Sequence, residues 1–113
     1  MRILEKPVTI RELKSIAENS FGDLVKAVVD VDRELIALDA ELHSDLEALL
    51  LDNGSSQKNL WGINFYPDLP EDDFVEFDAM INMRPSQKNM SRGVDDEKIR
   101  RKIIAVANKW VKP

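Results

Sequence analysis

Two stretches of the chain alternate apolar and polar residues as β-strands do, and each is followed by a turn and a second such stretch. The first pair consists of LVKAVVDV and ELIALD, which flank a turn near Asp32 and Arg33. The second pair consists of LWGINFYP and DFVEFDAMINMR, which flank DLPEDD. Because successive side chains of a strand point to opposite faces, a period of two over these lengths favours sheet over helix. The sequence therefore predicts two β-hairpins.

Helical periodicity occupies the segments before, between and after the hairpins. The expected helix boundaries are a capping box at Thr9 and Glu12, caps at Asp39 and Asp95, and a left-handed stop at Asn53-Gly54. Three helices and two hairpins in this order predict an α+β fold. We expect a four-stranded, mainly antiparallel sheet from the two hairpins, with the three helices packed mostly on one face.

The size and composition of the chain narrow its class. A length of 113 residues predicts a single domain over residues 1–113. The longest apolar run, Ile103 to Ala107, is too short to cross a bilayer, and MRILEKPVT lacks the pattern of a signal peptide. We therefore expect a cytoplasmic protein without a membrane segment. The absence of cysteine excludes disulfides and thiolate chemistry.

Charge is distributed unevenly along the chain, whose formal net charge is −5. Residues 1–83 hold 7 Lys or Arg and 18 Asp or Glu, whereas residues 84–113 hold 9 and 3. The basic end is either a solvated helix face or a surface for an anion or an acidic partner. Because the acidic body repels a polyanion, we expect nucleic-acid binding to be weak or absent. A homodimer through exposed sheet edges stays open.

Metal, cofactor and nucleophile signatures are weak. The single histidine, His43, lies in an acidic run in which only Asp39 and Glu47 share its side of a helix. No second histidine completes a usual zinc or iron site, so we expect no metal and no cofactor. The four glycines are isolated and form no phosphate-binding loop. His43 is instead expected to edge a leucine stripe and to pair with Asp39 or Glu47, which would raise its pKa.

The candidate site is the polar face of the second hairpin together with the loop after it. Pro85 has no backbone N–H to donate to a sheet ladder, so residues 86–92 are expected to be irregular. The candidate ligand-binding residues are Asn64, Tyr66, Asn82, Arg84, Gln87, Asn89 and Arg92. A purely structural alternative has the amides of this loop bonded to its own backbone and Arg84 paired with Glu76 or Asp78.

Two function classes fit these residues. The first is a module that binds a small ligand or a protein partner, with Arg84 contributing most because its guanidinium offers five donors at the end of a strand. The second is an enzyme that acts on a small polar substrate with the carboxylates of Glu76 and Asp78 and with Arg84 as an anion clamp. We prefer the first, because two carboxylates on an exposed strand are common without chemistry.

Three stretches also carry a family resemblance: ELHSDLEALLL, LWGINFYP, and MINMRPSQKN with RGV downstream. Together they resemble a prokaryotic family of uncharacterised proteins, domain of unknown function 5674, over nearly the whole chain. The resemblance implies a small intracellular protein of bacterial or archaeal origin. It implies no established activity, ligand or catalytic residue.

Overall fold

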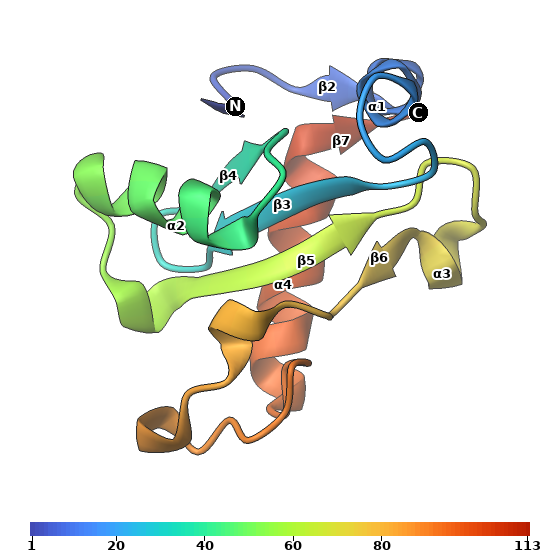
Figure 1. Cartoon of the computed structure of the whole chain (residues 1–113). Coiled ribbons are helices and arrows are strands. Elements are labelled where there is room, and N and C mark those ends of the chain that lie inside the picture. Colours follow the sequence, from blue (N-terminus) through green and yellow to red (C-terminus); the bar gives the residue numbers. More distant parts are fainter.

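A five-stranded antiparallel sheet forms the centre of the computed structural model, which describes residues 1–113 (Figure 1). The strands are β1 (Arg2–Ile3), β3 (Val25–Asp30), β4 (Leu35–Leu38), β5 (Leu60–Phe65) and β6 (Val75–Glu76). Their spatial order is β1-β4-β3-β5-β6. The predicted α+β class and antiparallel sheet are confirmed. The sheet has one strand more than expected, because the N-terminal residues pair with β4 at its edge.

The first hairpin forms as predicted, and a buried carboxylate holds its turn. Asp30 accepts the backbone N–H groups of Asp32 and Arg33, both at 2.9 Å. The hydroxyl of Ser55 donates to the other carboxylate oxygen at 2.6 Å. Three donors therefore replace the water that this carboxylate loses on burial.

Helices cover both faces of the sheet (Figure 1). The helices α1 (Ile10–Glu18) and α4 (Glu97–Trp110) pack against the face that carries Trp61, Ile63 and Phe65, as expected. The opposite face is covered by α2 (His43–Asp52). This face is also apolar, and its buried cluster consists of Val28, Ala37, Leu46, Leu50 and Leu60. The central strands are therefore buried on both sides, so two of the three predicted helices share a face and α2 covers the other.

The helix boundaries agree in part with the predicted caps. The capping box of Thr9 and Glu12 is present at α1, and Gly54 has a φ of +102° after α2. Two caps were expected at the wrong residue. The helix α2 begins after Leu42 rather than at Asp39, and α4 is capped by Asp96 rather than Asp95.

The second hairpin is shorter than its sequence pattern predicts. β5 pairs with β6 only at Val75 and Glu76, and a four-residue helix, α3 (Glu71–Phe74), precedes β6. The predicted strand through Arg84 is wrong beyond Glu76. The chain forms instead two single 3₁₀ turns, η2 (Met80–Asn82) and η3 (Pro85–Gln87). A third such turn, η1 (Gln57–Asn59), leads into β5.

A second, two-stranded sheet joins distant parts of the chain. β2 (Val8–Thr9) pairs in parallel with β7 (Val111–Lys112) at the end of α4. Two residues on each side are too few to show a period in the sequence, so this pair was not predicted. None of the helices has the length and apolar composition needed to span a membrane.

Candidate functional site

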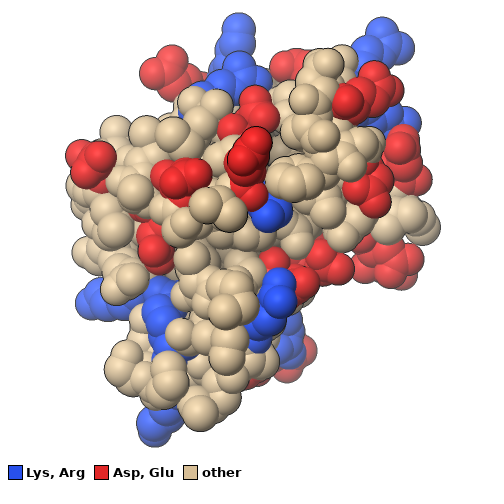
Figure 2. Space-filling model, in the orientation of Figure 1, with Lys and Arg blue, Asp and Glu red and all other residues tan.

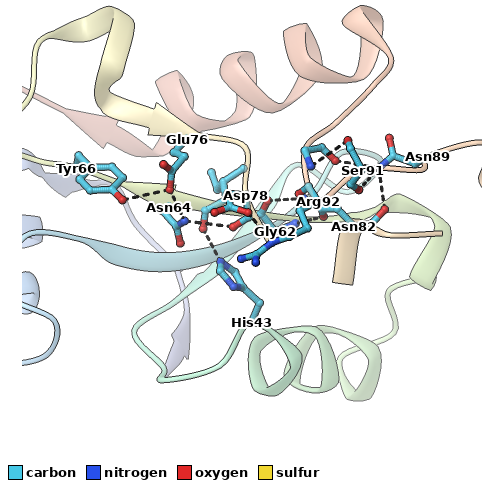
Figure 3. Close-up of polar contacts among 12 residues, drawn as sticks. His43, Gly62, Asn64, Tyr66, Glu76, Asp78, Asn82, Asn89, Ser91 and Arg92 are labelled. Atoms are coloured by element: carbon cyan, nitrogen blue, oxygen red, sulfur yellow. Dashed lines mark hydrogen bonds and ion pairs between the residues drawn. The ribbon is translucent and has the colours of Figure 1, made fainter. Parts of the chain in front are cut away.

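A pocket of about 340 Å³ lies between β3, the start of α2, β5 and the segment that follows β6. Polar side chains from several of these elements line it (Figure 3). Those that matter most for its chemistry are His43, Asn64, Tyr66, Glu76, Asp78 and Arg92. The pocket therefore brings β5 and β6, which the sequence predicts to carry the site, next to α2, which it does not.

Asn64 is the one side-chain amide that lines this pocket, and 6% of the residue is exposed. Its Nδ2 donates to Oε1 of Glu76 at 2.8 Å and to the backbone oxygen of Asp78 at 3.2 Å. These two bonds hold the orientation of the amide (Figure 3). Its Oδ1 is buried and accepts no hydrogen bond of normal geometry from the protein, although the Asn64 side chain lies close enough to the ring of His43 to raise the pKa of that ring. A buried polar atom without a partner is rare in native proteins and costs roughly 1–3 kcal/mol.

Tyr66 shares the carboxylate that Asn64 uses. Its hydroxyl donates to Oε1 of Glu76 at 3.2 Å. Partial burial and the charge of Glu76 raise the pKa of Tyr66, so the phenol stays protonated at neutral pH. Glu76 thus accepts two side-chain donors through Oε1, while its Oε2 accepts none from the protein.

His43 lies at the first position of α2 and reaches the sheet rather than an acidic neighbour. Its Nε2 is 2.9 Å from the carbonyl oxygen of Ile63. Burial lowers the pKa of His43, and the hydrogen bond to this carbonyl and the nearby side chain of Asn64 oppose the effect only in part. The expected pairing with Asp39 or Glu47 and the expected rise in pKa are therefore wrong. Because a carbonyl only accepts, the neutral imidazole carries its proton on Nε2 and leaves Nδ1 as an acceptor.

Two cationic side chains lie at the edge of the pocket. Nε of Arg92 is 2.8 Å from Oδ1 of Asp78, and both side chains are about half exposed. Nζ of Lys26 donates to the backbone oxygen of Glu41 at 2.8 Å. Figure 2 shows acidic and basic side chains mixed over this side of the molecule, with mainly basic ones where residues 80–93 lie. No three His, Asp or Glu side chains are grouped so that they would hold a metal ion.

Asn82 lies outside the pocket and serves the edge of β5. Its Oδ1 accepts the backbone N–H of Gly62 at 2.8 Å, and its Nδ2 donates to the backbone oxygen of Gly62 at 2.9 Å. The same Nδ2 also donates to the backbone oxygen of Arg92 at 2.9 Å. A side-chain amide therefore provides here the pair of hydrogen bonds that a neighbouring strand would provide.

Arg84 continues this edge contact beside Asn82. Its guanidinium donates to the carbonyl oxygens of Gln57 and Leu60 and lies 4.2 Å above the ring of Trp61. Burial lowers the pKa of Arg84 from that of a solvated arginine, and the nearby charge of Glu47 opposes the effect in part. The structural alternative, in which Arg84 pairs with Glu76 or Asp78, is therefore wrong on this point.

The remaining amides of the loop also bond to backbone. Nδ2 of Asn89 donates to the carbonyl oxygens of Asn82 at 2.7 Å and Gly93 at 2.9 Å, and its Oδ1 accepts the N–H of Asp95 at 2.8 Å. Gln87 is exposed and donates to the carbonyl oxygen of Lys58 at 3.0 Å. These bonds explain why the stretch is rich in amides: an irregular loop of this length has many backbone groups to satisfy.

The chain matches, over residues 2–110, a family described as "Protein of unknown function (DUF5674)". It belongs to that family. No curated protein and no solved structure matches this DUF5674 chain.

Three of the seven candidate residues of the DUF5674 chain meet in the pocket, and four do not. Those in the pocket are Asn64, Tyr66 and Arg92; those in the loop or at the strand edge are Asn82, Arg84, Gln87 and Asn89. Sequence reasoning did not include Lys26 and His43 in this site. Lys26 was detectable as the one charged residue inside LVKAVV, but nothing local placed the start of α2 beside β5.

Proposed function

We propose that the protein binds a small polar ligand in the pocket formed by α2, β5 and the segment after β6. The observation that carries this proposal is Oδ1 of Asn64, a buried acceptor with no hydrogen bond from the protein, on a residue that lines the pocket. A ligand with an N–H or O–H group would satisfy it and remove the cost of leaving it unpaired.

The surrounding groups support a binding role because they are already oriented. Asn64 and Tyr66 are held by Glu76, and His43 is held by the carbonyl of Ile63. Side chains that are ordered before the ligand arrives lose less conformational entropy on binding, which favours affinity.

Binding is preferred to catalysis because the anion clamp of the enzyme alternative is not part of the pocket. Arg84 was expected to act with Glu76 and Asp78, but its guanidinium is occupied by two backbone carbonyls and by Trp61. The carboxylates of Glu76 and Asp78 contact side chains that fix their orientation, namely Asn64, Tyr66 and Arg92. This arrangement suits recognition of a ligand.

A fragment screen by two-dimensional NMR tests the proposal. Ligands of the pocket should shift the side-chain amide resonances of Asn64 and the backbone resonances around Glu76 and Asp78. The variant Arg92→Gln removes a pocket residue, and Arg101→Gln is its matched control because Arg101 forms an exposed ion pair with Glu97. Binding should weaken in the first variant and stay unchanged in the second. A screen in which no compound shifts the pocket resonances would refute the proposal.

A further inference from the structure

One side of the pocket offers hydrogen-bond acceptors that have no protein donor. They are Oδ1 of Asn64, which is buried, and the second carboxylate oxygens of Glu76 and Asp78. The first oxygen of Glu76 accepts Nδ2 of Asn64, and that of Asp78 forms an ion pair with Arg92. The Nδ2 of Asn64 is committed to Glu76 and Asp78, so its amide cannot turn to present a donor without breaking two bonds. This side favours a ligand group that donates several hydrogen bonds and carries positive charge.

The other side of the pocket has the opposite character. The helix α2 begins there with Leu42 at its N-cap position, and no side chain caps it. The backbone N–H groups of His43 and Ser44 consequently donate to no protein acceptor. Lys26 lies at the same pocket, held near this helix start by the carbonyl of Glu41. Uncapped N–H groups at the positive end of a helix, beside a lysine, favour a carboxylate.

The formal charges of the pocket balance. Lys26 and Arg92 oppose Glu76 and Asp78, and the pair of Arg92 with Asp78 at 2.8 Å leaves one lysine and one glutamate to face a ligand. A ligand that is only cationic or only anionic would meet one like charge, whereas a ligand that carries both charges would meet none.

We propose that the ligand of this pocket is a small zwitterion of the free amino acid type, with its ammonium group at Asn64 and Glu76 and its carboxylate at the start of α2. This inference rests on the proposed function. The pocket volume of about 340 Å³ suits a molecule of this size. Leu24, Leu42 and Met80 also line the pocket, and the last two are more than half exposed, so they offer contact for an apolar side chain of the ligand.

The test compares three compounds that share one apolar body: norvaline, which has both charged groups, butylamine, which lacks the carboxylate, and pentanoate, which lacks the amine. Each is titrated into the labelled protein while the resonances of Asn64, Glu76 and Ser44 are followed. We expect norvaline to bind at least tenfold more tightly than either of the other two, because each missing charged group loses a charge-assisted contact.

Variants assign each charged group of the ligand to its side of the pocket. Glu76→Gln should weaken norvaline about tenfold and reduce its advantage over pentanoate, whereas Lys26→Gln should weaken it similarly and reduce its advantage over butylamine. Glu97→Gln and Lys14→Gln are matched controls, because both residues form exposed ion pairs away from the pocket. Affinity should not change in these controls.

The outcomes separate this inference from the proposed function. Equal binding of butylamine or pentanoate, or norvaline binding that neither pocket variant changes, would overturn the zwitterion. Fragment hits in the pocket without any response to norvaline would do the same and leave the proposed function standing. A pocket that responds neither to these three compounds nor to the fragment library would overturn both.

Discussion

The side chain of Asn82 pairs with the backbone of Gly62 as a neighbouring strand would, accepting its N–H at 2.8 Å and donating to its C=O at 2.9 Å. The strand β5 thus keeps its edge paired after β6 has ended. Open strand edges are sites of unwanted pairing between chains. The amide of Asn82 occupies the edge of β5 at Gly62, where β6 no longer pairs with it.

Replacement of Asn82 should therefore be costly. We expect Asn82→Ala to lower the free energy of unfolding by roughly 2–4 kcal/mol, because it leaves buried groups of Gly62 unpaired. Asn82→Asp keeps the acceptor but loses the donor and buries a charge, so it should be at least as destabilising. Urea denaturation measures both. Gln87→Ala, at an exposed residue of the same loop, is the control and should change stability by less than about 0.5 kcal/mol. Similar stabilities for the Asn82 and Gln87 variants would contradict the role of Asn82.

Gly62 should not tolerate a larger residue. A Cβ at this position would lie 2.4 Å from Cβ of Ala79 and 3.2 Å from the ring of His43. We expect Gly62→Ala to cost about 1–3 kcal/mol through overpacking. The double variant Gly62→Ala with Ala79→Gly should recover part of this loss, which thermal denaturation of the two single variants and the double variant will show as coupling. Additive effects of the two changes would mean that Ala79 is not the residue that excludes a side chain at Gly62.

Arg84 should act on stability rather than on the pocket. Arg84→Ala removes two donors to backbone carbonyls and the contact with Trp61, so we expect a loss of about 2–3 kcal/mol. Arg84→Lys should restore little of it, since an ammonium group cannot reproduce the planar fork. Ligands that shift the pocket resonances should do so equally in these variants. A variant with wild-type melting temperature and no ligand response would return Arg84 to the binding site.

Stability should depend on the titration of His43. Its folded-state pKa lies below the ordinary 6.5 because burial disfavours the charged form. At pH values between the folded-state pKa and 6.5, the unfolded chain therefore binds a proton on His43 that the folded protein does not. The contribution of His43 to stability is fully present above pH 6.5 and declines as the pH falls through the folded pKa. Lys26, which disfavours protonation, and Asn64 and Asp78, which favour it, also act on the imidazole.

His43→Gln isolates this effect, because glutamine has an amide donor for the carbonyl of Ile63 but does not titrate. The difference in free energy of unfolding between wild type and His43→Gln should become less favourable to wild type from about pH 7.5 to about pH 5.5. Chemical denaturation at several pH values measures it. A difference that does not change with pH would show that His43 is not held neutral by burial.

Periodic segments were predictable from the sequence, and the segment after β6 was not. The alternation in β3 and β5 and the capping box at Thr9 are local properties, and each appears where it was expected. The alternation also continued from Val75 to Met83, although the strand ends at Glu76. In this segment Asn82 is buried and Met83 is about half exposed, the reverse of what the pattern predicts.

The reason is that a side chain replaces the backbone in the sheet. Once the amide of Asn82 makes the two bonds to Gly62, the main chain is free to turn through η2, and a period of two no longer reports the buried face. The prediction of the candidate site likewise depended on the periodic segments. Asn64 and Tyr66 were found because Asn64 lies on a true strand and Tyr66 directly follows it, whereas His43 joins them through packing between elements distant in sequence.

The parallel pair of β2 and β7 has a consequence for how this fold is completed in the cell. Val8 and Thr9 precede every helix of the fold in the chain, and their partners Val111 and Lys112 follow all of the other helices and strands. The central hairpin, α2 and β5 are then able to associate during synthesis, while the segment around β2 waits for α4 to arrive. The pair of β2 and β7 can therefore form only after α4 has been synthesised.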